Sequence, residues 1–120
     1  MAAETIDPTT FAELQASAGE DFTKELIDTF LEEAPVMLGE LRAALAAGDA
    51  DGFRRAAHSL KSNSQTFGAT QLGALARELE LTGLAALGGA GSATASAALD
   101  QLSAAYDQAA VALKALCHGG

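Results

Sequence analysis

The chain has 120 residues, 49% of them hydrophobic and 5% aromatic, which is enough for one domain with a single core. It carries 7 Lys and Arg residues against 16 Asp and Glu residues, a formal charge of -9. This acidity argues against nucleic acid and anionic membranes as main partners, because binding to phosphate-rich surfaces requires a basic footprint.

The pattern of apolar residues predicts helices along the whole chain. No stretch alternates β-branched and polar residues as a strand does. Asp7 followed by Pro8 is typical of a helix N-cap and first turn. We therefore expect a short first helix that buries Phe11 and Leu14 and ends before Gly19.

A second, long helix is predicted from near Asp21 to the turn at Gly48. Pro35 lies inside it, removes one backbone donor and collides with the preceding turn, so a kink or a local restart is expected there. Its core-facing positions are expected to be Phe22, Leu26, Ile27, Phe30, Leu31, Met37, Leu38, Leu41 and Leu45.

A third helix follows, with Asp51 as its expected N-cap and Gly68 as its stop, since glycine readily adopts the left-handed conformation that ends a helix. At about 100° per residue, one set of side chains forms an apolar stripe roughly 100° wide. The members of this stripe are Phe53, Ala56, Ala57, Leu60, Ser64 and Phe67.

Two more helices complete the chain. Thr70 is expected to cap a fourth helix that buries Leu72, Leu75, Ala76 and Leu79 and fades by Gly83. The glycine-rich segment 87–92 is predicted to be a flexible linker; a phosphate-binding loop there is disfavoured, because a helix and not a strand precedes it. The last helix opens at Ser92 or Thr94, and its expected buried positions are Leu99, Leu102, Tyr106, Ala110, Leu113 and Leu116.

These elements predict an all-α fold, an antiparallel four-helix bundle with an additional short N-terminal helix. The bundle is expected to span residues 5–117, between flexible ends at 1–4 and 118–120. No basic region followed by an apolar run and no apolar stretch of about 20 residues is present, so we expect a cytoplasmic protein without a membrane span. Cys117 has no partner for an internal disulfide, and with His118 it lacks the further ligands of a zinc site.

His58 lies outside the apolar stripe of the third helix, so its imidazole is expected to face solvent. Arg54, Lys61, Ser62 and Gln65 stand three, four or seven residues from it and therefore share its side of the helix. Neutral imidazole is a nucleophile near pH 7. If it attacks a phosphoryl group, Lys61 and Arg54 are placed to receive the negative charge, Gln65 to add a hydrogen bond, and Ser62 is small enough to let another protein approach.

The basic residues gather near this histidine. Arg54, Arg55 and Lys61, three of the seven, lie within eight positions. Two interpretations stay open at this point: ordinary salt bridges on a solvated face, or a cationic patch that awaits an anion.

The sequence gives little support for a metal, hydrolase or kinase site. A metal site or a hydrolase requires acids and bases that converge, but His58 has no acid three or four residues away, and Asp51 is seven residues back. The other histidine, His118, is near the end of the chain, and no nucleotide-binding element of a kinase is present. We therefore expect no metal, no cofactor and no autonomous kinase activity.

One run of residues resembles the signature of histidine-containing phosphotransfer (HPt) domains: His58-x-Leu60-Lys61-x-x-Ser64-x-x-x-Gly68-Ala69. The resemblance extends to Phe30-Leu31-x-x-Ala34-Pro35, to the Ala46-x-Gly48-Asp49 turn and to Leu79-Glu80, and it covers about residues 5 to 117. It implies a four-helix bundle that passes a phosphoryl group between aspartates of response-regulator receiver domains.

The resemblance also implies roles for single residues. His58 would be the phosphoacceptor, and Lys61 would help to hold the phosphoryl oxygens. The family commonly has glycine where this chain has Ser62, which adds a hydroxyl and some bulk to the docking face. Ser64 and Gly68 are interpreted as structural, one for a tight helix contact and the other for the helix end.

The implied partners are receiver domains and a hybrid sensor histidine kinase, with Mg²⁺ held by the receiver and none by this chain. The expected state is a monomer. Two alternatives stay open: a helical adaptor that docks receivers without carrying phosphate, and the phosphoacceptor domain of a chemotaxis-type histidine kinase.

Overall fold

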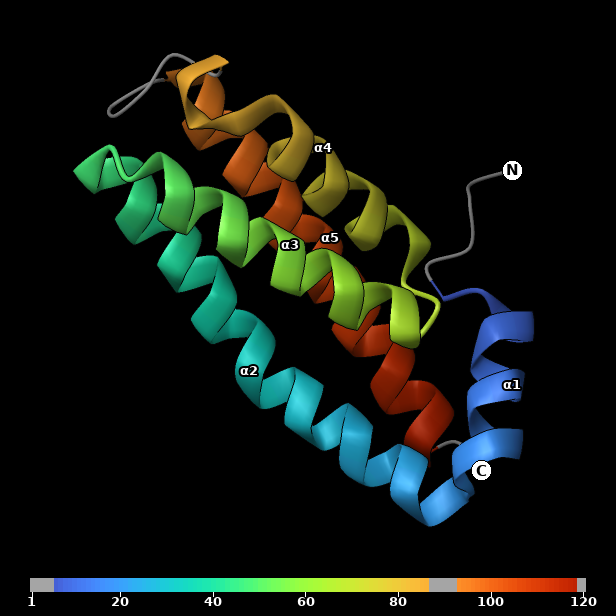
Figure 1. The fold of residues 1–120 in the computed structure, drawn as a ribbon. Helices are drawn as coiled ribbons and strands as arrows, with labels where there is room; N and C mark the ends of the chain where they lie inside the picture. Colours follow the sequence, from blue (N-terminus) through green and yellow to red (C-terminus); the bar gives the residue numbers. More distant parts are fainter. Residues whose placement is uncertain (1–5, 87–92, 119–120) are drawn as a thin grey trace.

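The computed structural model describes residues 6–86 and 93–118. Over these ranges the chain forms five helices and no strand, as predicted (Figure 1). The helices are α1 (Pro8–Ala18), α2 (Glu20–Ala47), α3 (Ala50–Thr66), α4 (Thr70–Ala86) and α5 (Ala93–His118). The last four form the bundle, and α1 lies at one end of it, against α2 and α3.

Some predictions fall outside what the structure describes. These are the linker expected at 87–92, the flexible end expected at 1–4, and the side chains of Cys117 and His118. Of the flexible end expected at 118–120, the structure describes only the backbone of His118, which is the last residue of α5. Among the described residues, no helix carries an apolar stretch long enough to cross a bilayer.

Short polar side chains and glycines set the helix ends. The Asp7 carboxylate accepts hydrogen bonds from the Thr10 hydroxyl at 2.6 Å and from the Thr10 backbone N–H at 3.3 Å, and these bonds hold the pKa of Asp7 below its usual value. Pro8 follows in the first turn, as predicted. Gly48 adopts a left-handed conformation (φ 69°) and ends α2.

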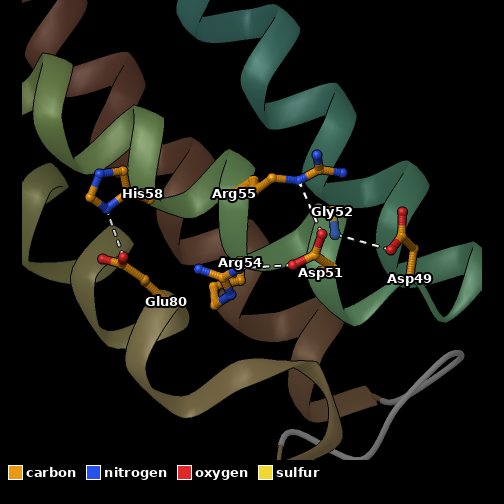
Figure 2. Close-up of polar contacts among 7 residues, drawn as sticks. All are labelled: Asp49, Asp51, Gly52, Arg54, Arg55, His58 and Glu80. Atoms are coloured by element: carbon orange, nitrogen blue, oxygen red, sulfur yellow. Dashed lines mark hydrogen bonds and ion pairs between the residues drawn. The ribbon is translucent and has the colours of Figure 1, made fainter.

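The predicted N-cap of α3 was wrong by two residues. Asp49, not Asp51, accepts a hydrogen bond from the Gly52 backbone N–H at 3.0 Å (Figure 2). Gly48 and Asp49 form the turn between the two helices, so α3 begins directly after Asp49, and Asp51 lies inside the first helical turn.

The core stripe of α3 is buried at all six predicted positions, and α2, α4 and α5 follow their predicted patterns with two exceptions. Phe22 is 53% exposed and Leu116 is 46% exposed. Phe22 stands about 140° around the helix from Ile27, which places it off the buried face, and Thr23 is buried instead. Leu116 lies near the end of α5, beyond the last fully buried residue, Leu113.

The hairpin of α3 and α4 depends on a turn at Gly68, which has a φ of 76°. A side chain there would also meet the Asp7 carbonyl oxygen at 3.0 Å and Thr10 Cβ at 3.1 Å. Farther along the hairpin, Gly73 of α4 faces Ser64, whose buried hydroxyl donates to the Leu60 carbonyl at 2.6 Å. The structural roles expected of Ser64 and Gly68 therefore fit the packing.

Pro35 does not restart α2, which continues through it as one helix of 28 residues. A proline in this place leaves the carbonyl of the residue four positions earlier, Leu31, without its helical donor. The Tyr106 hydroxyl on α5 donates to that carbonyl at 3.2 Å, and its ring packs on Phe30 with the centroids 6.1 Å apart. Partial burial raises the pKa of Tyr106, which keeps this donor protonated.

We predict that Tyr106→Phe lowers the free energy of unfolding by about 1–2 kcal/mol, because the Leu31 carbonyl loses its donor. In a Pro35→Ala background the helical donor returns, so the same substitution costs less. Urea denaturation of the four variants of this cycle measures the difference. Equal costs in the two backgrounds would show that the hydroxyl does not compensate for Pro35.

Candidate functional site

The α3–α4 hairpin brings three polar side chains together: His58 and Lys61 from α3, and Glu80 from α4. His58 Nδ1 lies 2.7 Å from Glu80 Oε2, and Lys61 Nζ lies 2.8 Å from Glu80 Oε1 (Figure 2 shows the first contact). His58 precedes Ala69 in the hairpin turn by 11 residues, and Glu80 follows it by 11. The antiparallel register therefore places them opposite each other.

The three side chains differ in their access to solvent. The His58 side chain is 55% exposed, whereas Lys61 and Glu80 are only 20% and 15% exposed. The ion pair of Lys61 and Glu80 thus lies in the contact between the helices, and the imidazole projects above it. A nucleophile in this position is open to a partner, while the charges beside it are partly shielded from water.

The charge state of Glu80 fixes the roles of the two imidazole nitrogens. The hydrogen bond from the Lys61 ammonium is the main cause that lowers the pKa of Glu80, and the bond to His58 adds to it against the cost of desolvation. An ionised carboxylate can only accept hydrogen bonds, so His58 Nδ1 is the donor. In the neutral ring this leaves the lone pair on Nε2.

Arg54 and Arg55 are engaged elsewhere. The Arg54 guanidinium lies 2.8 Å from Asp51 Oδ1, and Arg55 Nε lies 3.4 Å from Asp51 Oδ2 (Figure 2). The hydrogen bond from Arg54, followed by the charge of Arg55, holds the pKa of Asp51 below its usual value. All three side chains are more than half exposed. Of the two interpretations of the basic cluster, salt bridges describe the two arginines, and Lys61 alone belongs to the histidine site.

Ser62 and Gln65 are exposed on α3, one and two turns beyond His58. The Ser62 carbonyl accepts a bond from the Thr66 hydroxyl at 3.2 Å, within the helix. Neither side chain is hydrogen-bonded to His58 in the described structure, so both belong to the surface around the imidazole and not to its immediate support.

Glu80 was not predicted as a functional residue. No acid stands three or four residues from His58 on its own helix, and the acid that contacts it comes from the neighbouring helix. Two signals pointed to it: the equal spacing of His58 and Glu80 from the hairpin turn, and the position of Glu80 directly after Leu79, a buried residue of α4. Within the described part of the chain, no three His, Cys, Asp or Glu side chains gather as metal ligands would.

We predict that Glu80→Gln makes stability less dependent on pH in the acidic range. Because the pKa of Glu80 is lower in the folded state than its ordinary value of 4.5, its ion pair stabilises the fold above that value. This contribution disappears as the pH falls through the lower folded pKa. Urea denaturation at a series of pH values from about 6 to 3 measures the slope.

Glu78→Gln is the matched control, since Glu78 is an exposed carboxylate on the same helix. It should leave the slope near that of the unmodified chain. If both variants show the same slope, Glu80 does not contribute through its ionised form.

The comparisons with known proteins agree with the helical fold. The family model described as "Hpt domain" matches residues 25–118. The crystal structure of histidine-containing phosphotransfer protein B (HptB) from Pseudomonas aeruginosa PAO1 is similar, with a TM-score of 0.86 and 30% sequence identity over 99% of both chains. No curated protein matches the chain. Since the family model covers well over half of the sequence, the chain belongs to the Hpt domain family.

Proposed function

We propose that this chain is a phosphorelay intermediate in which His58 accepts a phosphoryl group from the phospho-aspartate of a receiver domain and passes it to the aspartate of another. The donor is a response regulator or the receiver of a hybrid sensor histidine kinase. One observation carries the proposal: an imidazole 55% exposed whose Nδ1 is bonded to Glu80 at 2.7 Å, which in the neutral ring places the lone pair on Nε2.

The transfer step follows from this geometry. The Nε2 lone pair attacks phosphorus, the bond from phosphorus to the aspartate oxygen breaks, and the receiver carboxylate leaves with the electron pair. The Nδ1 proton stays on the ring, which becomes cationic and is stabilised by the Glu80 carboxylate. The Lys61 ammonium, one turn beyond His58, neutralises charge on the phosphoryl oxygens.

The partner completes the reaction. The receiver supplies the Mg²⁺ that offsets phosphoryl charge, and this chain contributes no cofactor of its own. Ser62 and Gln65, exposed beyond His58, form part of the docking surface, and Arg54 lies at its edge. In this proposal the chain acts as a monomer in the cytoplasm and is a phosphoryl carrier without kinase activity.

We predict that His58→Gln abolishes phosphorylation and leaves the fold intact, because the side chain is more than half exposed. The measurement is transfer of label from a radiolabelled phosphorylated receiver, followed by acid and alkali treatment. Phosphohistidine is lost in acid and survives alkali. Label retained by the variant would contradict the site assignment. If the unmodified chain binds receivers but takes no label, the result would favour the alternative of a helical adaptor that does not carry phosphate.

We predict that Lys61→Ala slows transfer by roughly 10- to 100-fold, the rate equivalent of one charge-assisted hydrogen bond of about 1.5–3 kcal/mol. Rapid-quench measurement of the same transfer gives the rate. Lys24→Ala is the matched control, because Lys24 is an exposed lysine on α2. An unchanged rate in Lys61→Ala would remove this residue from the mechanism.

A further inference from the structure

We propose that Glu80 sets the equilibrium of the transfer by competing with the phosphoryl group for the Lys61 ammonium. This inference rests on the function proposed above and adds a thermodynamic role for a third residue. In the unphosphorylated chain the carboxylate serves two partners at once, His58 through Oε2 at 2.7 Å and Lys61 through Oε1 at 2.8 Å.

The Lys61 ammonium is the counter-charge that Glu80 Oε1 depends on. This oxygen is buried, and among the described residues no hydrogen bond satisfies it apart from its ion pair with Lys61. Moving the ammonium away leaves a desolvated carboxylate oxygen without compensation, which is unfavourable. The unphosphorylated state therefore holds Lys61 close to α4.

Phosphorylation of His58 adds a second anion that attracts the Lys61 ammonium. The phosphoryl group on Nε2 carries between one and two negative charges near neutral pH, and it lies on the same side of α3 as Lys61, one turn away. If the Lys61 ammonium moves toward the phosphoryl oxygens, its ion pair with Glu80 is weakened. The two anions also repel each other across the imidazole ring.

Both effects raise the free energy of the phosphorylated chain relative to the unphosphorylated one. The carboxylate has an opposing influence, since it stabilises the cationic ring through Nδ1. The variant Glu80→Gln keeps an acceptor oxygen for the Nδ1–H but loses the negative charge. It therefore preserves the positioning of the imidazole and removes the competition for Lys61. Glu80 thus keeps the phosphohistidine ready to donate.

The test measures the equilibrium constant for transfer between a phosphorylated receiver domain and the full chain. The variants are Glu80→Gln, Lys61→Met and the double substitution. We expect Glu80→Gln to shift the equilibrium toward phosphorylated His58 by roughly 10-fold, within the range of coupled charged neighbours. In the Lys61→Met background the shift should be smaller, because no ammonium remains to be shared and only the direct repulsion between the two anions is left.

Glu78→Gln, which removes the same charge from an exposed position on α4, should leave the equilibrium unchanged. Glu80→Ala should shift the equilibrium in the same direction and provides the test if the glutamine variant does not fold. An equal shift with and without Lys61, no shift, or a shift toward the receiver overturns the inference. If the unmodified chain takes no label at all, the proposed function itself has failed, so the two failures are distinguishable.

Discussion

The pairing of one carboxylate with two cationic or proton-donating groups is the interaction on which the site depends. Glu80 reaches across from α4 and holds both the nucleophile and the cation of α3. Without it, the imidazole would rotate freely on the surface and either nitrogen would carry the proton. The bond to Nδ1 gives the ring one orientation and one reactive nitrogen, and the ion pair keeps an ammonium beside it. The chemistry therefore belongs to the hairpin and not to a single helix.

The rest of the bundle keeps that hairpin in register. The Asp7 backbone N–H donates to the Gly68 carbonyl at 2.7 Å, so the start of α1 is fixed to the hairpin turn. Gly73 and Ser64 face each other where the two helices pack. On the opposite side, the Tyr106 hydroxyl restores the hydrogen bond that Pro35 removes, and α2 stays continuous along the bundle. The bundle thus presents an exposed imidazole in a fixed place, which suits the role proposed for His58.

The helical pattern was enough to predict five helices, the buried face of α3 and the exposure of His58, since each depends on a local period of apolar residues. Features set by contacts between helices were harder to predict. Asp51 and Asp49 are both acceptable caps, and the short turn of Gly48 and Asp49 decides between them. At Pro35, the donor that satisfies the Leu31 carbonyl is a hydroxyl 75 residues away along the chain. Glu80 was missed as a functional residue for the same reason, because its partners lie on another helix.

The spacing between His58 and Glu80 makes the length of the chain between them a chemical constraint. A helix turns by about 100° with each residue, so one residue inserted between these positions would carry the carboxylate away from the imidazole. The apolar stripe of α4 would rotate with it and leave the core. Insertions after Gly83 do not change this spacing. The turn from α3 to α4 is thus the part of the chain whose length the reaction holds fixed, and variation in length has to be accommodated elsewhere.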